Sequence, residues 1–429
     1  MGDRREGRDR RKRKAVLLGI ATSGAALLSG CGVVPGGAGG SPAAITVMTW
    51  APEKTDATNM PGMPAVATAY AKYINAKGGI NGHQLNVLTC NEHNTTTGAA
   101  ACAQRASDEG VAAVVGSYSQ YGTSFLSTLE AEGIPYLGGF GVTDDEFDSP
   151  LSYPVNGGLT TLLAGNGRQL APDCSSVALV RPDTAAGDQF PAFIDAGLHA
   201  GGRANAVDML AAEDSTDYTS TAERAIGDNT DGRCVTAVLG DKTPTFFDSF
   251  RRTTTTDPLT GKEIPPKARI ASVLGSVQQS TIDSSGGSES PLEGAYVTGW
   301  YPPASDPHWA TMKQAITKYA FGDNRIDADD PGVQTTWIAY SVLTEVVESM
   351  GNGSVDATSL KRALDNAHGI STDGLTPNLG WRDQDLASVE NHPRMCNGKV
   401  TYQVVSNGRL VAARKGFVDV TRTLENSSG

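Results

Sequence analysis

Between residues 45 and 137 the sequence alternates short apolar runs with longer stretches in which apolar residues recur at helical spacing. The apolar runs predict four strands, at residues 45–50, 85–88, 111–115 and 134–137. The stretches between them predict three helices, at residues 63–74, 97–110 and 125–132. Parallel strands need such crossover helices, so this order predicts an α/β fold in which helices cover both faces of a parallel sheet.

A second series of strands and helices follows an interruption at residues 143–157, which contain acidic residues, proline and glycine. Its strands are predicted at residues 177–180, 207–210, 235–239 and 270–273, with a further apolar run at 294–301. Helices are then predicted at residues 306–322, 333–350 and 358–368, before a terminal hairpin around Asn407 and Gly408. With 429 residues the chain is long enough for two lobes, each a doubly wound parallel sheet with its own core.

The chain is acidic, with 47 Asp and Glu against 35 Lys and Arg and a net charge of −12. An acidic surface argues against nucleic acid as a partner and against electrostatic binding to anionic lipid. Acidic clusters at residues 144–148 and 327–330 lack the spacing of an EF-hand, so we expect solvated loops there. The six histidines are scattered and no Cys-x-x-Cys pair occurs, so we expect no metal site and no cofactor.

The first 30 residues have the order of an export signal. Basic residues at 10–14 precede an apolar stretch at 15–28 that is too short to span a bilayer, and Leu-Ser-Gly then leads to Cys31. This pattern resembles a bacterial lipobox, which implies a lipoprotein signal peptide at residues 1–30, lipidation of Cys31, and anchoring to the outer face of the cytoplasmic membrane. The alternative is a chance cysteine in an ordinary signal peptide. Residues 31–44 are predicted to be a flexible tether, because 32–44 are rich in Gly and Pro.

Four further segments carry a family pattern, at residues 70–82, 111–119, 132–136 and 292–298. Together they resemble the type I periplasmic binding proteins, in particular the branched-chain amino acid (Leu/Ile/Val) binding lipoproteins of ABC transporters. The resemblance covers most of residues 45–415 and is strongest in the first lobe. It implies two lobes joined by three crossovers, a ligand cleft between the lobes, closure by a hinge motion, and delivery of the solute to an ABC permease.

The resemblance also implies how the chain is divided between the lobes. Lobe one is expected at residues 45–150 and 294–368. Lobe two is expected at residues 151–293 and 369–420, and residues 421–429 are expected to be a tail.

Five cysteines follow the lipobox, and an exported protein can form disulfides. The sequence alone leaves their connectivity open. The lobe layout favours the pairs Cys90–Cys102 and Cys174–Cys234, each within one lobe. Cys396 is then left without a disulfide partner.

Ser117, Tyr118 and Ser119 follow a predicted strand and precede a predicted helix, which is where parallel sheets bind ligands. Backbone N–H groups at a helix start hold an anion such as an amino acid carboxylate, and small hydroxyl residues let the backbone approach. The resemblance places a ligand-binding serine in this loop, and both Ser117 and Ser119 fit. The alternative is helix capping without a ligand.

Two other strand ends of lobe one are candidates for ligand contact. The loop after the fourth strand, residues 138–143, is the family's second contact region in this lobe and supplies Gly139 and Phe140. Its glycines allow close approach of the backbone. Trp50 ends the first strand and is either an apolar wall of the cleft or a core residue.

The equivalent strand ends of lobe two supply Asp183, Thr184, Asp241 and Ser276. The family typically has aromatic residues at the first two of these strand ends and an acid at the third, and this chain departs from the pattern at all three. Asp183 or Asp241 is a candidate partner for a ligand ammonium group, although each also suits a turn or cap. The departures favour a ligand more polar than a branched-chain amino acid, or simply a different one.

A catalytic reading finds little support in the sequence. The segment from Gly116 to Gln120 lacks the final glycine of the Gly-x-Ser-x-Gly motif of α/β hydrolases, and no phosphate-binding motif occurs. We therefore expect a binding protein and not an enzyme, which acts as a monomer outside the cytoplasm and captures a small polar solute for a permease. The alternatives are an envelope lipoprotein that senses a ligand without transport and, with less support, a hydrolase.

Overall fold

The computed structural model describes residues 42–55, 58–184, 186–212, 214–256 and 259–427. The expected signal peptide and the expected lipidation at Cys31 lie outside these residues. The described residues belong to one compact unit. Across the described ranges, no helix combines the length and the apolar character needed to cross a membrane.

A first sheet contains five parallel strands in the order β2-β1-β3-β4-β5. These strands are β1 (Ile45–Ala51), β2 (Leu85–Asn91), β3 (Ala113–Val115), β4 (Tyr136–Leu137) and β5 (Ser152–Tyr153). Neighbouring residues of β1 enter different cores. Val47 shares one core with α1 (Gly62–Asn75) and α11 (Pro331–Ser349), and Met48 shares another with α2 (Thr96–Asp108) and α3 (Gly122–Glu132). The sheet is therefore buried on both faces, which is typical of continuous apolar strands.

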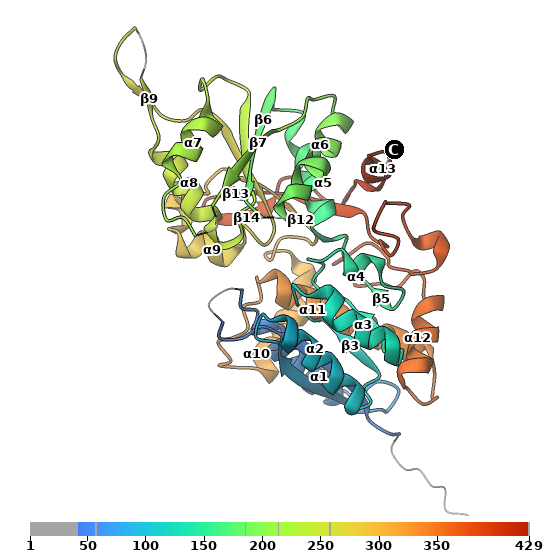
Figure 1. Ribbon diagram of the computed structural model, residues 1–429. Coiled ribbons are helices and arrows are strands. Elements are labelled where there is room, and N and C mark those ends of the chain that lie inside the picture. Colours follow the sequence, from blue (N-terminus) through green and yellow to red (C-terminus); the bar gives the residue numbers. More distant parts are fainter. Residues whose placement is uncertain (1–41, 56–57, 185, 213, 257–258, 428–429) are drawn as a thin grey trace, which may run out of the picture. The chain divides into compact units, whose positions relative to one another are not determined.

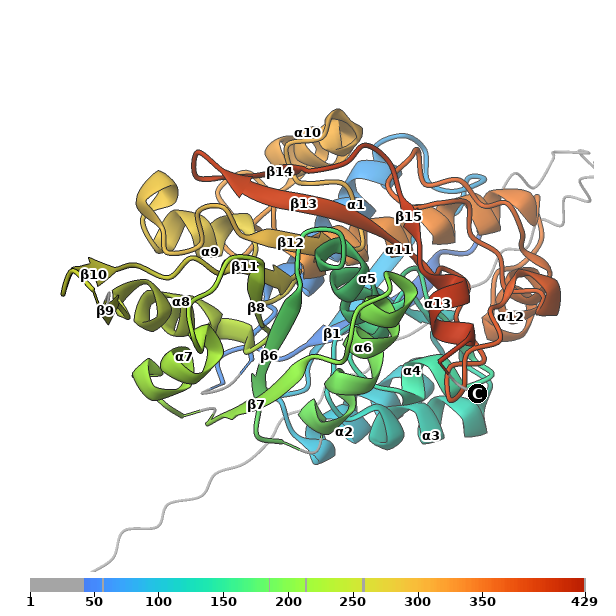
Figure 2. The ribbon, with the colours of Figure 1, turned by 90° about the horizontal axis from the view of Figure 1, so that it is seen from above.

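A second sheet has the order β14-β13-β12-β11-β8-β6-β7, and β15 pairs with β13. Its strands are β6 (Ser176–Pro182), β7 (Val207–Ala211), β8 (Arg233–Ala237), β11 (Arg269–Val273), β12 (Tyr296–Gly299), β13 (Lys399–Ser406), β14 (Arg409–Ala412) and β15 (Val418–Asp419). Strands β6, β7, β8, β11 and β12 are parallel, whereas β13 is antiparallel to its partners. Figure 2 shows β13 and β14 along the edge beside β12.

Helices cover the second sheet on both faces (Figure 1). Residues of α7 (Thr219–Ile226), α8 (Thr243–Arg252) and α9 (Gln279–Ser284) share a core with Val180 of β6. Residues of α5 (Gly158–Leu170) and α6 (Phe190–Ala200) pack with Val177 and Leu179 of the same strand. The remaining elements are short or lie outside the sheets: α4 (Asp145–Asp148), α10 (Ala310–Tyr319), α12 (Ala357–Asn366), α13 (Thr421–Glu425), β9 (Thr255–Thr256), β10 (Glu263–Ile264), and the 3-10 helices η1 (Gly187–Gln189), η2 (Gly240–Lys242), η3 (Gly287–Glu289), η4 (Pro307–Trp309) and η5 (Asp383–Asp385).

The predicted α/β class with two helix-covered sheets is confirmed. Three segments differ from the expected division of the chain. Strand β5 was expected in lobe two, with residues 151–293, but it pairs with β4 in the first sheet. Strand β12 was expected in lobe one, with residues 294–368, but it pairs with β11 and β13 in the second sheet. The expected tail contains helix α13, whose Leu424 is fully buried.

Both predicted disulfides are confirmed. Cys90 of β2 is bonded to Cys102 of α2, and Cys174, just before β6, is bonded to Cys234 of β8. Each bond therefore joins elements of one sheet layer. Cys396 is a free cysteine, and burial raises the pKa of its thiol to about 12.

Candidate functional site

A cavity of about 450 Å³ lies beyond the carboxyl ends of several strands. Its walls come from the loops after β3 and β4, from the first turns of α5, and from the segment that joins β6 to α6. Ligands of parallel sheets bind at this end of the strands, where helix N-termini point. The lining residues are Tyr118, Gln120, Val142, Thr143, Asp144, Leu159, Thr160, Leu163, Pro182, Thr184, Ala186, Gly187, Gln189, Phe190 and Phe193.

The lining combines apolar surface with neutral hydrogen-bonding groups. Tyr118, Phe190 and Phe193 supply aromatic rings, and the polar groups are mainly amides and hydroxyls. Among these described lining residues, only Asp144 carries a full charge. Such a lining suits a small organic molecule that has an apolar part. Nowhere in the described ranges do three or more His, Cys, Asp or Glu side chains gather closely enough to hold a metal ion.

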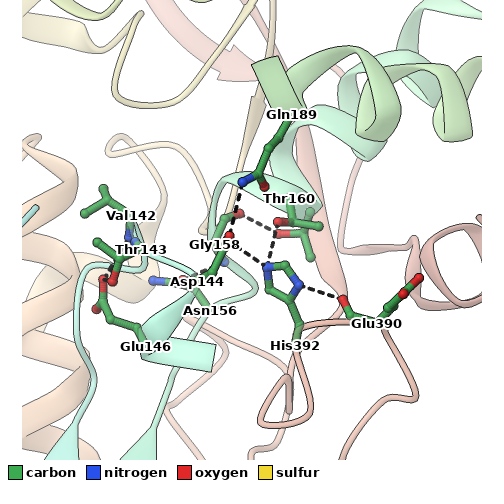
Figure 3. A network of polar contacts seen from close by, with 11 residues as sticks. Val142, Thr143, Asp144, Glu146, Asn156, Gly158, Thr160, Gln189, Glu390 and His392 are labelled. Carbon is green, nitrogen blue, oxygen red and sulfur yellow. Dashed lines mark hydrogen bonds and ion pairs between the residues drawn. The ribbon is translucent and has the colours of Figure 1, made fainter. Parts of the chain in front are cut away.

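Asp144 lies at the centre of a polar network on one side of the cavity (Figure 3). Gln189 Nε2 donates to Asp144 Oδ2 at 3.3 Å, and His392 Nε2 lies 3.5 Å from Asp144 Oδ1. The hydrogen bond from His392 is the main cause that lowers the pKa of Asp144. His392 is buried, with Nε2 at 3.2 Å from Thr160 Oγ1 and Nδ1 at 3.0 Å from the Glu390 carbonyl oxygen. Because a carbonyl oxygen only accepts, Nδ1 must carry a proton in this geometry.

Glu146 organises the loop that supplies Val142 and Thr143 to the cavity. Its Oε1 accepts from the N–H groups of Val142 at 3.0 Å and Thr143 at 3.2 Å, and its Oε2 accepts from the N–H of Gly141 at 3.1 Å. Gly141 has a φ of +85°, which a side chain at that position would strain. Glu146 is 2% exposed, and burial raises its pKa to about 7 despite these N–H donors. The prediction of a solvated acidic loop at residues 144–148 is therefore wrong for this side chain.

Two of the ten predicted ligand contacts, Tyr118 and Thr184, line the cavity. The hydroxyls of Ser117 and Ser119 are buried instead and bonded within the first sheet layer. Ser117 Oγ accepts from the Trp50 N–H at 3.1 Å, and Ser119 Oγ accepts from the Tyr121 N–H at 3.2 Å. The second contact is not the helix cap that the sequence left open, because α3 begins after Tyr121, its N-cap residue, and no side-chain hydrogen bond caps it.

The other candidates of lobe one are also buried away from the cavity. The indole of Trp50 packs edge-on against Phe125, with ring centroids 5.3 Å apart, in the core with α2 and α3. Phe140 packs behind Tyr118 at the same centroid distance. A Cβ atom on Gly139 would collide with Glu146 and Tyr136, so glycine is needed there for packing. None of these three is among the residues that line the cavity.

The remaining candidates of lobe two also lie outside the lining. Asp183 and Asp241 are exposed side chains. Ser276 is 5% exposed, and its hydroxyl accepts from the Gly240 N–H at 3.1 Å. Only Thr184 from this set faces the cavity, and its Oγ1 also accepts from the Gly187 N–H at 3.2 Å.

Sequence reasoning missed most of the lining, including Gln120, Asp144, Thr160, Gln189 and Phe193. These residues lie in the first turns of helices or just before them, beyond the loops in which contacts were sought. One usable signal was present for Gln120, which lies between the predicted strand at residues 111–115 and the predicted helix at residues 125–132.

Comparison with known proteins identifies the family. A family model described as periplasmic binding protein matches residues 55–391. None of the curated proteins matches the chain. Because the family match spans well over half of the chain, it assigns the family independently of any single relative.

Several solved structures share the fold. A leucine binding protein from Thermotoga maritima is 17% identical, with 87% of this chain and 99% of that chain covered and a TM-score of 0.65. A solute binding protein of an ABC transporter from Rhodopseudomonas palustris, in complex with 3,4-dihydroxybenzoic acid, is 14% identical, with 88% and 98% covered and a TM-score of 0.66. A fatty acid ABC transporter substrate-binding protein from Thermomonospora curvata is 12% identical, with 90% and 95% covered and a TM-score of 0.67.

These findings confirm the predicted resemblance to type I periplasmic binding proteins. The family consists of solute-binding proteins of ABC transporters and not of enzymes. The cavity beyond the strand ends is where a ligand is expected in such a fold. This chain belongs to the periplasmic binding protein family.

Proposed function

We propose that this protein captures a small solute in the 450 Å³ cavity and delivers it to an ABC permease by reversible closure of the two lobes. The best support is that the residues lining the cavity come from both sheets. Tyr118, Gln120 and Asp144 follow strands of the first sheet, whereas Thr184 and Phe190 follow a strand of the second. A ligand that contacts both sets favours the closed arrangement, because it gains interactions that the open arrangement lacks.

The lining also bears on the kind of solute. An amino acid or a similar small polar molecule remains the proposed class, with its apolar part against Phe190 and Phe193. The solved relatives are named for leucine, for a dihydroxybenzoic acid and for fatty acids, so the fold accommodates varied ligands. No Lys or Arg is found among the described lining residues. A ligand carboxylate would therefore depend on backbone N–H groups, hydroxyls and amides.

We expect a thermal-shift screen of the purified protein to identify the solute. A ligand that binds only the folded state stabilises it by about 2.7 kcal/mol at a hundredfold excess over Kd. Gln120→Ala is then expected to weaken binding of the hit about tenfold, because one hydrogen-bonding group of the cavity is lost. The matched control is Gln104→Ala on the exposed surface of α2, which should leave the affinity unchanged. Equal effects of both substitutions would place the binding site elsewhere.

The membrane anchor is a second element of the proposal, and it is supported by the lipobox pattern that ends at Cys31. Cys31→Ala is expected to move the protein from the membrane fraction to the soluble extracytoplasmic fraction, because acyl chains supply the attachment. Cys396→Ala provides the matched control and should stay with the membrane. Retention of Cys31→Ala in the membrane fraction would contradict an anchor at this residue.

A further inference from the structure

A second cavity of about 330 Å³ adjoins the first. The two cavities share Asp144, Gln189 and Phe193 in their linings. The far wall of the second cavity comes from the segment around Glu390 and His392. The side chains that separate the two spaces therefore belong to both of them.

Two of the shared side chains are hydrogen-bonded to each other. Gln189 Nε2 donates to Asp144 Oδ2 at 3.3 Å (Figure 3). Gln189 is exposed, and the Asp144 side chain is 53% exposed, so neither is held by surrounding packing. A change of rotamer at Gln189 would remove the bond and free Oδ2 of Asp144.

Two carboxylates lie at the boundary, and His392, which is charged only if it is protonated, faces Asp144. The hydrogen bond from His392 lowers the pKa of Asp144, and Glu390 adds a second carboxylate to the far cavity. Neither lining includes a Lys or Arg among the described residues. His392 is 2% exposed, and its ring nitrogens already face Thr160, Asp144 and a backbone carbonyl. Oδ2 of Asp144, the oxygen bonded to Gln189, is therefore the oxygen that a ligand cation can approach.

We propose that the two cavities form one elongated ligand site, and that the solute carries a protonated amine which replaces the Gln189 amide at Asp144 Oδ2. Its apolar or aromatic body then lies in the first cavity against Tyr118, Phe190 and Phe193. The amine lies at the boundary, and any further polar part extends toward Glu390. This inference rests on the proposed solute capture and names the class of solute.

Three probes with the same phenylbutyl body test the inference by calorimetry: 4-phenylbutylamine, 4-phenylbutanol and 4-phenylbutyrate. We expect the amine to bind at least tenfold more tightly than the alcohol, and the acid to bind most weakly. Asp144→Asn is expected to weaken amine binding about tenfold and to leave alcohol binding within twofold. Gln189→Ala is expected to strengthen amine binding, because the competing amide is removed.

The neighbouring Asp145 provides the matched control, since its carboxylate accepts from Thr123 and lines neither cavity. Asp145→Asn should leave the affinities for all three probes unchanged. Acid binding as tight as amine binding, or an Asp144→Asn variant that binds the amine normally, would overturn the inference while solute capture stands. If none of the probes binds but another small solute does, this inference alone fails. If no solute of any class binds, the proposed function fails with it.

Discussion

Replacing Cys174 and Cys234 together with alanine is expected to lower the free energy of unfolding by about 4 kcal/mol. The disulfide between them spans 60 residues of sequence, and the loss of loop-closure constraint in the unfolded chain grows with the length of that loop. Both cysteines are fully buried in a core with Leu170, Leu198 and Ala271, so alanine also removes packing contacts there. Equilibrium unfolding in urea, without reductant, measures the change.

The disulfide of the first sheet layer provides an internal comparison. Cys90 and Cys102 are separated by 12 residues, so their replacement with alanine is expected to cost less, about 3 kcal/mol. Cys396→Ala removes a thiol that forms no disulfide and donates one hydrogen bond to the Pro154 carbonyl oxygen, so it should cost less than either pair. Losses below about 1 kcal/mol for both pairs would contradict the entropic argument, because neither bond would then constrain the unfolded chain.

The fold was predictable from the sequence to the extent that it depends on local pattern. Parallel strands buried on both faces give short apolar runs, and Val111 to Val115 is such a run. The hairpin at Asn407 and Gly408 was predictable because both residues tolerate positive φ, and they have φ values of +52° and +70°. The sheet membership of β5 and β12 was not predictable in this way. Which strands pair depends on long-range packing, and no local pattern in either strand specifies its partner.

The site was less predictable than the fold, for a reason visible in Ser117 and Ser119. A hydroxyl after a strand can face a ligand or bond to its own backbone, and the sequence is the same in both cases. In this chain both hydroxyls are buried and bonded inside the lobe. The cavity instead uses Gln189 and Phe193, whose approach to Tyr118 depends on how the two sheets are placed by the crossovers.

The second large effect is expected at Glu146, whose replacement with alanine should lower the free energy of unfolding by about 3 kcal/mol at pH 5. Three backbone N–H groups, of Gly141, Val142 and Thr143, donate to its carboxyl group and would lose their acceptor. The bond from Gly141 is buried, and a buried donor left without a partner costs about 1–3 kcal/mol, whereas the part-buried donors of Val142 and Thr143 add less. The same loop supplies two residues to the cavity, so solute affinity should fall together with stability.

The pH dependence of this effect separates Glu146 from an ordinary packing residue. Its pKa is raised to about 7 in the folded protein, so the folded state holds the proton more tightly than the unfolded state. Stability contributed by this proton is fully present below about pH 4.5 and is lost as the pH rises to about 7, with a slope of at most about 1.4 kcal/mol per pH unit. The difference in the free energy of unfolding between wild type and Glu146→Ala, measured by urea unfolding, should therefore shrink over this pH range. Glu132→Ala, at an exposed position of α3, should match the wild type throughout. A constant difference between wild type and Glu146→Ala would mean that the buried carboxyl does not titrate there.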